Sequence, residues 1–338
     1  MIRVRTYVPS SQWRAAGSPI STHLSTLIYN PAAGGLRAKG HQKLKRAATI
    51  LENAGHIISP VPTTGPGTAG GIARLAIERG ATCILVAGGD GTINEVVDGM
   101  VNSPVPLGIL PAGTANVLAT ELGLGRNIEL AAQLIPQCVA RQIALGCLDG
   151  GSGPRHFLSM AGIGFDAHIV YHLSARLKMH LGKGAYWISG FAQAVRRYPE
   201  FEIKVDGGVP AVCSFALVSR VRNYGGDFEI ATSASLLQDH FEVVLFRGRH
   251  SLPYLKYVLG MVTGRLAGMR GVSFLTGRSV RVSDPADRRV YIQVDGEYAS
   301  RLPASIVLAP EALTLLVPPA YLRHASAKIG GFLGAGVE

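Results

Sequence analysis

The chain carries a glycine-rich segment with one acidic residue, Gly88-Gly89-Asp90-Gly91-Thr92. Glycine is required where a backbone takes a positive φ or must approach a ligand without an intervening Cβ. Backbone N–H groups in such a segment can bind phosphate, above all beside a helix N-terminus. Asp90 would repel phosphate unless a cation or a proton transfer intervenes. The segment predicts a phosphate and Mg²⁺ site or an acid–base role for Asp90, with an ordinary Gly-Asp-Gly turn as an equal alternative.

A strand and a helix are expected to position this segment. Residues 84–87 form a short apolar run, which is typical of a buried strand. Apolar residues then recur at helical spacing at Ile93, Val96, Val97 and Met100. Thr92 is predicted to be the N-cap of that helix. The glycines would therefore lie between the C-terminal end of a strand and the N-terminus of a helix.

Three further polar loops follow expected strands in the first part of the chain. Strands are predicted at 23–29, 56–61 and 107–110, followed by loops at 30–35, 63–67 and 111–116. Strands that alternate with helices through short loops predict a parallel, doubly wound α/β sheet. Ligands of such sheets bind outside the C-terminal ends of the strands. We therefore expect the four loops to line one phosphate site.

The pattern changes after about residue 140. Short β runs separated by turns are predicted at 142–147, 157–162, 201–205, 211–218, 241–246, 280–282, 290–294 and 306–308. Helices are expected only at 185–197 and 253–269. Such a succession predicts an antiparallel β-sandwich or distorted barrel. We predict an extension at 1–22, an α/β domain at 23–140, a β domain at 141–318 and a tail at 319–338 that packs back on the first domain or touches lipid.

The overall composition agrees with two globular domains and favours anionic partners. The chain has 338 residues, and its 33 Lys and Arg against 22 Asp and Glu give a net charge of +11. The four cysteines are scattered, so neither a zinc site nor a disulfide framework is expected. No apolar run long enough to cross a bilayer is present, and no signal peptide is expected. Nucleic-acid binding is not favoured, because no basic strand with interleaved aromatic residues is found.

Five motifs in this order resemble those of the soluble lipid kinases of the diacylglycerol kinase and sphingosine kinase family. They are Asn30-Pro31-x-x-Gly34, Gly88-Gly89-Asp90-Gly91-Thr92-x-Asn94-Glu95, Pro111-x-Gly113-Thr114-Ala115-Asn116, Gly162-x-Gly164-Phe165-Asp166 and Val294-Asp295-Gly296-Glu297. The resemblance covers residues 24 to 318. It implies an N-terminal nucleotide-binding domain, a C-terminal β-sandwich with lipid determinants, and ATP-dependent phosphorylation of a lipid hydroxyl.

The resemblance also implies roles for individual residues near the nucleotide. Matching positions would bind ATP through Asn30, Pro31, Ala32, Ala33, Gly34, Thr63, Gly88, Gly89, Asp90, Gly91, Thr92, Ile93, Asn94, Gly113, Thr114 and Asn116. Thr63 is preferred to Thr64 by its spacing to Ala69. Asp90 is expected to organise metal and phosphate, with a role as the base as the alternative.

The family's general base corresponds to Glu297. Spacing alone favours a plain hairpin turn here, because Asp-Gly is a strong turn signal; the resemblance favours the base. Asp166 is expected to bind a substrate headgroup, with a turn cap as an equal alternative.

A structural Mg²⁺ site of the bacterial family members matches the segment 236–241. It would consist of the Asp239 carboxylate with the carbonyl groups of Leu236 and Phe241. This sequence departs from the family at His240, which stands where a glycine is usual, and at Asp227, which replaces the third glycine of a usual Gly-Gly-Gly run. If the replaced glycine had a positive φ, His240 would strain the loop. The metal is the part of the resemblance that these departures put in question.

Basic residues gather in the second half of the chain, with ten Lys and Arg against four Asp and Glu between residues 247 and 301. Such a patch could dock peripherally on an anionic membrane. The apolar stripe of the helix at 253–269 is interpreted as core packing.

The leading hypothesis is an ATP- and Mg²⁺-dependent lipid kinase that converts diacylglycerol, or a related lipid, to its phosphate. We expect it in the cytoplasm at the inner face of the membrane. The alternatives are an NAD-kinase-like enzyme and a catalytically silent nucleotide- or lipid-binding regulator, and a homodimer is left open.

Overall fold

The computed structural model describes residues 23–37, 40–151, 153–164, 198–225, 228–249, 251–284, 286 and 289–325. Several expectations lie outside these residues. They are the extension at 1–22, the headgroup contact of Asp166, the departure at Asp227, the helix at 185–197 and the tail from residue 326 onward.

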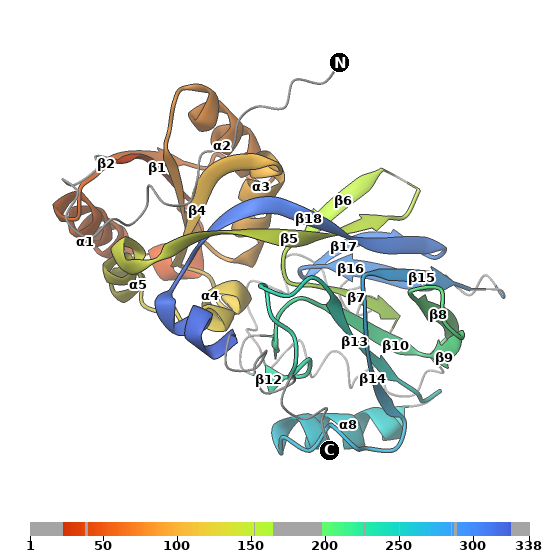
Figure 1. The fold of residues 1–338 in the computed structure, drawn as a ribbon. Coiled ribbons are helices and arrows are strands. Elements are labelled where there is room, and N and C mark those ends of the chain that lie inside the picture. Colours follow the sequence, from red (N-terminus) through yellow and green to blue (C-terminus); the bar gives the residue numbers. More distant parts are fainter. Residues whose placement is uncertain are drawn as a thin grey trace, which may run out of the picture.

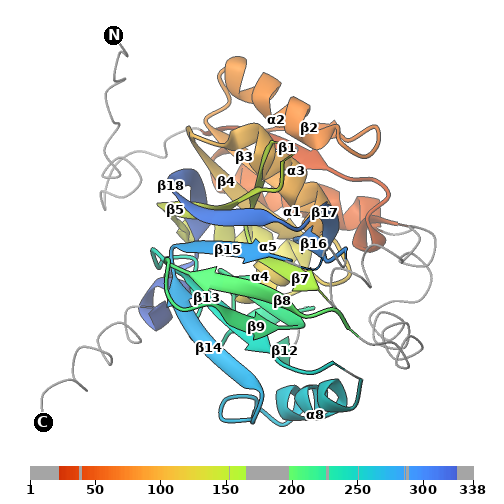
Figure 2. The ribbon, with the colours of Figure 1, turned by 90° about the vertical axis from the view of Figure 1, so that its right-hand side faces the viewer.

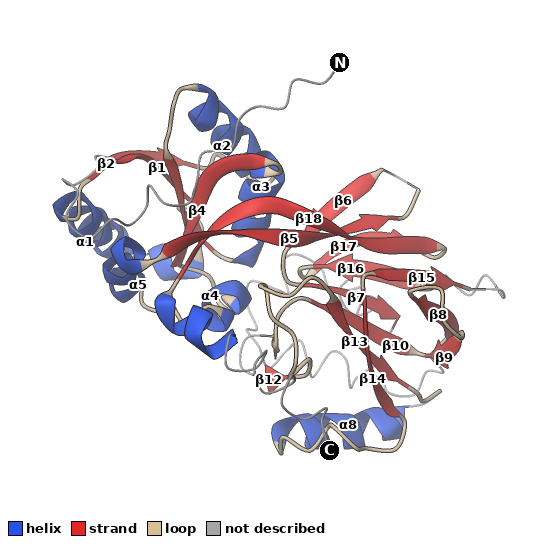
Figure 3. Cartoon of the chain, in the orientation of Figure 1, coloured by secondary structure: helices blue, strands red, loops and turns tan. Residues whose placement is uncertain are grey.

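The first domain is a parallel sheet covered by helices (Figures 1 and 3). Its strands are β1 (His23–Tyr29), β2 (His56–Pro62), β3 (Cys83–Gly88) and β4 (Ser103–Pro111), in the order β2-β1-β3-β4. Its helices are α1 (Gly40–Asn53), α2 (Ala69–Glu78), α3 (Asp90–Met100), α4 (Val117–Glu121) and α5 (Ile128–Leu134), with 3₁₀ turns η2 (Gly34–Leu36) and η3 (Ile135–Gln137). Every residue of β3 is buried, as expected for a strand covered on both faces.

The second domain is an antiparallel β-sandwich. One sheet has the order β14-β13-β10-β7-β16-β17, and the opposite layer contains β15, β8 and β9. The bounds are β6 (Pro154–Phe157), β7 (Met160–Gly164), β8 (Phe201–Val205), β9 (Ala211–Cys213), β10 (Phe215–Ser219), β11 (Asn223–Tyr224), β12 (Phe228–Glu229), β13 (Phe241–Phe246), β14 (Val272–Gly277), β15 (Ser279–Ser283), β16 (Tyr291–Val294) and β17 (Glu297–Arg301). The core between the layers includes Phe157, Phe201 and Phe241, each at most 1% exposed.

Two long strands belong to both domains, β5 (Val139–Asp149) and β18 (Ala304–Val317). β18 pairs in parallel with β4 of the first domain and antiparallel with β5 and β15. Figure 2 shows β5 and β18 running between the first-domain strands and β15. The predicted division at residues 140 and 141 therefore falls within β5. Only residues 306–308 of β18 were expected as a strand, so its pairing with the first sheet was missed.

Three predicted helices differ in extent from the observed ones. Thr92 is not an N-cap, because α3 already begins at Asp90 with Gly89 as its N-cap. The helix expected after Asn116 is two short helices, α4 and α5, separated by glycines at 123 and 125 with positive φ. Helix α8 (Ser251–Val262) ends before Gly264, whose φ of 66° is left-handed, and does not continue to 269. No helix in the described ranges is long and apolar enough to span a membrane.

Candidate active site

The loops that follow β1 and β3 are joined by side-chain hydrogen bonds. The Asn30 side chain donates to Thr92 Oγ1 over 3.1 Å, and its Oδ1 accepts from the N–H of Ala32 over 2.9 Å. The N–H of Asn30 donates to Ala87 O in β3 over 3.0 Å. A Cβ on Gly88 would lie 2.7 Å from Thr92 Cβ, so only glycine allows α3 to begin this closely behind β3. Asn30 therefore holds the first loop against the first turn of α3.

The loop that follows β4 packs directly on the glycine-rich segment. A Cβ on Gly89 would lie 3.2 Å from Gly113 Cα, and a Cβ on Gly113 would overlap Gly89 Cα. Asn116 has a left-handed φ of 50°, and its side chain closes the loop through hydrogen bonds with the N–H and carbonyl groups of Gly113 of 2.8 and 2.9 Å. The glycines are therefore required by the close approach of two backbones.

The remaining two loops lie at the same edge of the sheet. A Cβ on Gly34 would lie 3.8 Å from Thr114 Oγ1. Thr63 is 9% exposed, and its N–H donates to Tyr29 O at the end of β1 over 2.9 Å. The structure thus brings together the four loops, as the parallel sheet predicts. Pro31, Ala32 and Gly34 are exposed in the first of them, and Ala33 is buried.

Residues 93–95 continue the motif into α3 with different surroundings. Ile93 is 1% exposed and packs in the core, so its side chain is not available to a ligand. Asn94 is partly buried in the first turn. Glu95 accepts hydrogen bonds from the N–H groups of Gly67 (2.8 Å) and Ala69 (3.0 Å). Glu95 therefore caps the N-terminus of α2 and fixes the loop that carries Thr63.

Asp90 lies where two helices begin. It is the first residue of α3, and its Oδ1 accepts a hydrogen bond from the N–H of Val117, the first residue of α4, over 2.8 Å. Burial raises the pKa of Asp90, and the N–H donors of Asn116, Val117 and Leu118 oppose that rise. Two helix N-termini thus place N–H groups and positive dipole ends around one carboxylate. Backbone N–H groups at helix N-termini are groups that can bind phosphate, and the Asp90 carboxylate lies among them.

A tight hairpin faces these loops from the second domain. Asp295 and Gly296 have φ values of 48° and 84° between β16 and β17, as a two-residue type I′ turn requires. The Asp295 carboxylate accepts hydrogen bonds of 2.8 to 2.9 Å from the N–H groups of Leu158, Ser159 and Met160. Burial raises its pKa to about 6 against those donors, and the charge of Asp90 adds to the rise. The hairpin and Asp90 are thus close enough to interact electrostatically.

Glu297 is the first residue of β17 and points at the glycine-rich segment. A Cβ on Gly91 would lie 3.4 Å from Glu297 Oε1. Glu297 Oε2 accepts from Arg155 Nη2 over 2.7 Å, and Arg155 Nη1 donates to Tyr298 O over 2.9 Å. The segment 295–297 is therefore a hairpin turn that also carries a carboxylate to the glycine-rich loop after β3. Arg155 was missed from the sequence, since a single arginine just before the strand expected at 157–162 gives no signal.

The residues expected to bind a structural Mg²⁺ are not arranged as a ligand set. The Asp239 carboxylate is 71% exposed and forms an ion pair with Arg278, and the Leu236 carbonyl accepts a hydrogen bond from Arg220 over 2.7 Å. Phe241 begins β13 and pairs with Gly277. No group of three His, Cys, Asp or Glu residues in the described ranges is arranged to hold a metal ion. These donors do not fit the cation that the resemblance implies.

Comparison with known proteins agrees with this fold. The family model of the diacylglycerol kinase catalytic domain matches residues 25–148, and that of the YegS C-terminal NAD kinase beta sandwich-like domain matches residues 159–317. A diacylglycerol kinase of Bacillus subtilis is 30% identical over 298 residues, which are 86% of this chain and 95% of that protein. A diacylglycerol kinase of Staphylococcus aureus is 26% identical over 296 residues, covering 86% of this chain and 91% of the other.

A solved structure shares the whole fold. The crystal structure of a diacylglycerol kinase from Bacillus anthracis superposes with a TM-score of 0.71 at 23% identity, covering 88% of this chain and 98% of the other. The α/β domain and the β-sandwich, each matched by its own family model, define the class. The chain belongs to the diacylglycerol kinase family of lipid kinases.

Proposed function

We propose that this protein transfers the γ-phosphate of ATP to the free hydroxyl of diacylglycerol or a closely related membrane lipid, in a reaction that requires Mg²⁺. The observation that carries the proposal is the position of the Glu297 carboxylate. It lies against Gly91, where the loops after β1, β2, β3 and β4 come together. A carboxylate at this point can serve an acceptor hydroxyl that approaches the end of a polyphosphate chain.

The four loops are proposed to bind ATP. The segments 30–34, 88–94 and 113–116, together with Thr63, would position the phosphates through backbone N–H groups and the N-termini of α3 and α4. When Mg²⁺ is bound, it neutralises charge on the β- and γ-phosphates, and Asp90 is the carboxylate proposed to hold it. A cation there would also reduce the repulsion between Asp90 and Asp295.

In the proposed step, the lipid hydroxyl oxygen forms a bond to the γ-phosphorus. The bond between that phosphorus and the β–γ bridging oxygen breaks, and ADP leaves with the electron pair. Glu297 accepts the proton that the hydroxyl loses. Arg155 holds the Glu297 carboxylate through the hydrogen bond of 2.7 Å, so that it faces Gly91. Asp90 takes part through charge and loop geometry, because its Oδ1 is engaged by the N–H of Val117.

Contact with the membrane is proposed to involve α8, which lies at the end of the β-sandwich away from the first domain (Figure 1). Leu259 is 64% exposed and Val262 is 59% exposed, and Lys256 and Arg265 are exposed near them. The stripe interpreted as core packing is thus buried only in part. We expect Leu259→Glu to reduce co-sedimentation with anionic vesicles, and equal binding would remove α8 from the proposal.

A direct assay tests the proposed reaction. The full chain is incubated with labelled ATP and Mg²⁺ and with vesicles that contain diacylglycerol, monoacylglycerol, ceramide or sphingosine, and in parallel with NAD. We expect label in the phosphorylated diacylglycerol or a related glycerolipid. Label on NAD would instead support the NAD-kinase-like alternative, and label on none of them would contradict the proposed transfer.

A further inference from the structure

A fully buried arginine occupies the centre of the turn at residues 236–240. Arg220 follows β10 and has 0% exposed surface. Its Nη1 donates to Gln238 O over 2.6 Å and to His240 O over 3.2 Å, and its Nη2 donates to Leu236 O over 2.7 Å. A fourth hydrogen bond, from Nη2, reaches Ala144 O in β5 over 3.3 Å. The carbonyl groups of alternate residues in the turn thus point at one guanidinium.

This arrangement carries out the task expected of a cation. Carbonyl oxygens that converge in a turn repel one another unless a positive charge or a set of donors lies between them. A planar guanidinium supplies fixed N–H donors and cannot lose its proton under ordinary conditions. Burial lowers the pKa of Arg220 to about 10. Because this value is still well above 7, the group is charged at neutral pH. A buried charge is tolerated where hydrogen bonds compensate the lost hydration. The four carbonyl groups supply that compensation at Nη1 and Nη2, whereas Nε is buried without a partner in the described part of the chain.

The Asp239 side chain lies on the outside of the turn. Its carboxylate points outward to the Arg278 guanidinium, and its carbonyl accepts from Arg278 Nε over 3.0 Å. The one carboxylate that the resemblance assigns to the metal therefore neutralises a surface arginine. The Leu236 carbonyl, a second assigned ligand, is held by Arg220. The two assignments fail for the same physical reason, because each oxygen already has a cationic partner in the chain.

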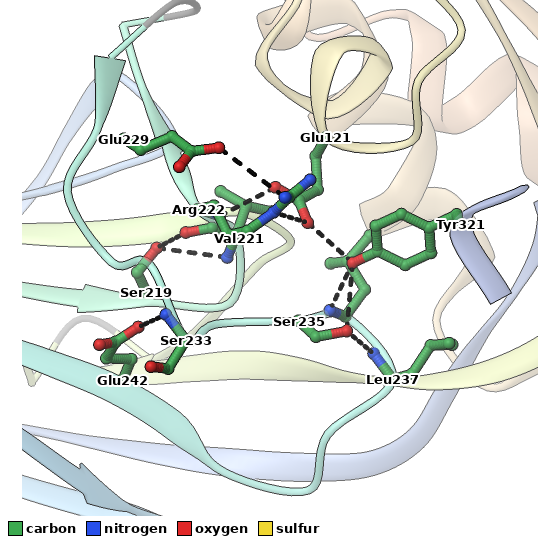
Figure 4. A network of polar contacts seen from close by, with 11 residues as sticks. Glu121, Ser219, Val221, Arg222, Glu229, Ser233, Ser235, Leu237, Glu242 and Tyr321 are labelled. Carbon is green, nitrogen blue, oxygen red and sulfur yellow. Dashed lines mark hydrogen bonds and ion pairs between the residues drawn. The ribbon is translucent and has the colours of Figure 1, made fainter. Parts of the chain in front are cut away.

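The turn is also connected to helix α4 through a buried network (Figure 4). The Leu236 N–H donates to the Tyr321 hydroxyl over 3.0 Å, and that hydroxyl donates to Glu121 Oε1 over 2.8 Å. Glu121 is 1% exposed at the end of α4, and its Oε2 accepts from the N–H of Arg222 over 2.9 Å. Figure 4 shows Glu121 between Arg222 and Tyr321. These hydrogen bonds therefore link the turn to α4, the helix whose first N–H group donates to Asp90.

We propose that the guanidinium of Arg220 takes the place of a structural divalent cation, so that the β-sandwich of this protein folds and stays folded without a bound metal. The proposal concerns the turn alone and does not depend on the phosphate acceptor or on the Mg²⁺ that accompanies ATP. It makes the cation at residues 236–240 a covalent part of the chain.

The first test uses the unmodified full chain without nucleotide. Its thermal unfolding midpoint is measured after dialysis against EDTA and again in excess Mg²⁺ or Ca²⁺, and its metal content is measured after gel filtration. We expect the same Tm in all three buffers and clearly less than one divalent ion per chain. A Tm that falls in EDTA and returns with Mg²⁺, or one ion per chain that survives gel filtration, would overturn the proposal.

The second test removes the guanidinium. Arg220→Ala leaves four buried carbonyl groups without their donor, so we expect the Tm to fall by roughly 5–15 °C. Arg220→Lys keeps the charge but has one side-chain nitrogen, so its Tm should lie between that of the original chain and that of Arg220→Ala. Arg249→Ala is the matched control, because Arg249 forms a 2.6 Å ion pair with Glu200 while being 70% exposed; its Tm should change little. An Arg220→Ala protein as stable as the control would contradict the proposal, and if that variant does not fold, the first test decides.

Discussion

The loops after β3 and β4 and the turn at residues 236–240 both gather polar backbone groups, but of opposite kinds. In the loops, N–H groups at the start of α3 and α4 surround the Asp90 carboxylate, and a second carboxylate, Glu297, lies 3.4 Å from a Cβ built on Gly91. In the turn, carbonyl groups surround the guanidinium of Arg220. The first region offers donors together with acids, which is the arrangement that an anion with its cation requires. The second region contains its own cation and needs no ligand.

The largest effect that would sharpen this contrast is expected from Glu297→Gln. The amide cannot accept the hydroxyl proton, so kcat should fall by about 10²–10⁴-fold while the Tm stays close to that of the original chain. Steady-state kinetics with the best lipid acceptor measure it. Glu129→Gln is the control, because Glu129 also pairs with an arginine, Arg46, at 3.3 Å but on α5 away from the loops. Equal kcat values for Glu297→Gln and the control would exclude Glu297 as the base.

The next effect tests whether the loops depend on backbone contact. In Gly113→Ala the new Cβ would overlap Gly89 Cα and lie 2.9 Å from Asn116 Oδ1. Overpacking costs about 1–3 kcal/mol and 1.4 kcal/mol is tenfold in affinity, so we expect the KM for ATP to rise by about tenfold.

Gly71→Ala is the matched change for Gly113→Ala. Gly71 lies within α2, and no atom lies within 4 Å of its Cβ position. Alanine should stabilise that helix by about 0.5–1 kcal/mol and leave the KM for ATP unchanged. An unchanged KM in Gly113→Ala as well would show that the contact between the two loops does not matter for ATP.

A smaller effect is expected from Arg155→Gln, which frees the Glu297 carboxylate. The pair is partly exposed, with side-chain exposures of 36% and 52%, and such pairs contribute about 0–1 kcal/mol. We therefore expect kcat to fall by about two- to fivefold with little change in the KM for ATP. Arg155→Lys should recover part of the loss. If kcat is unchanged in Arg155→Gln, the arginine does not position Glu297.

The smallest effect concerns Asp295, whose folded-state pKa is raised from 3.8 to about 6. A raised carboxyl pKa means that the folded state binds the proton more tightly, so this group favours folding at low pH and opposes it as the pH rises from about 4 to 6. The Tm of the original chain minus that of Asp295→Asn should therefore decrease across this window. Thermal unfolding at several pH values measures the difference, and a constant or rising difference would contradict the assignment.

The meeting of the four loops at one edge of the first sheet could be predicted from the sequence because its determinants are local. Glycines at 88, 89, 91 and 113 mark places where backbone must meet backbone, and β–α alternation puts the ends of parallel strands at one edge. The Asp295-Gly296 turn was visible for the same reason. Even there, the start of the helix was predicted three residues too late, because the N-cap is Gly89 and Thr92 lies inside α3, where its hydroxyl accepts from the Asn30 side chain.

The features that were missed all depend on partners far away in the chain. Arg155 meets a carboxylate 142 residues later, and Tyr321 meets Glu121 200 residues earlier. Nothing in the sequence distinguishes Arg220 from other arginines, because its partners are backbone carbonyl groups of the turn at 236–240. A resemblance transfers a ligand set by position, and it cannot report that a neighbouring side chain has taken the place of the ligand.

The strand β18 has a consequence for the order in which the protein is made. It is the partner of β4 within the parallel sheet, yet it ends at Val317, more than two hundred residues after β4. On the ribosome, the sheet of the first domain stays uncovered on the β4 side until residues 304–317 have emerged. A fragment that stops before residue 304 should accordingly aggregate, and supplying the missing strand in trans should rescue it.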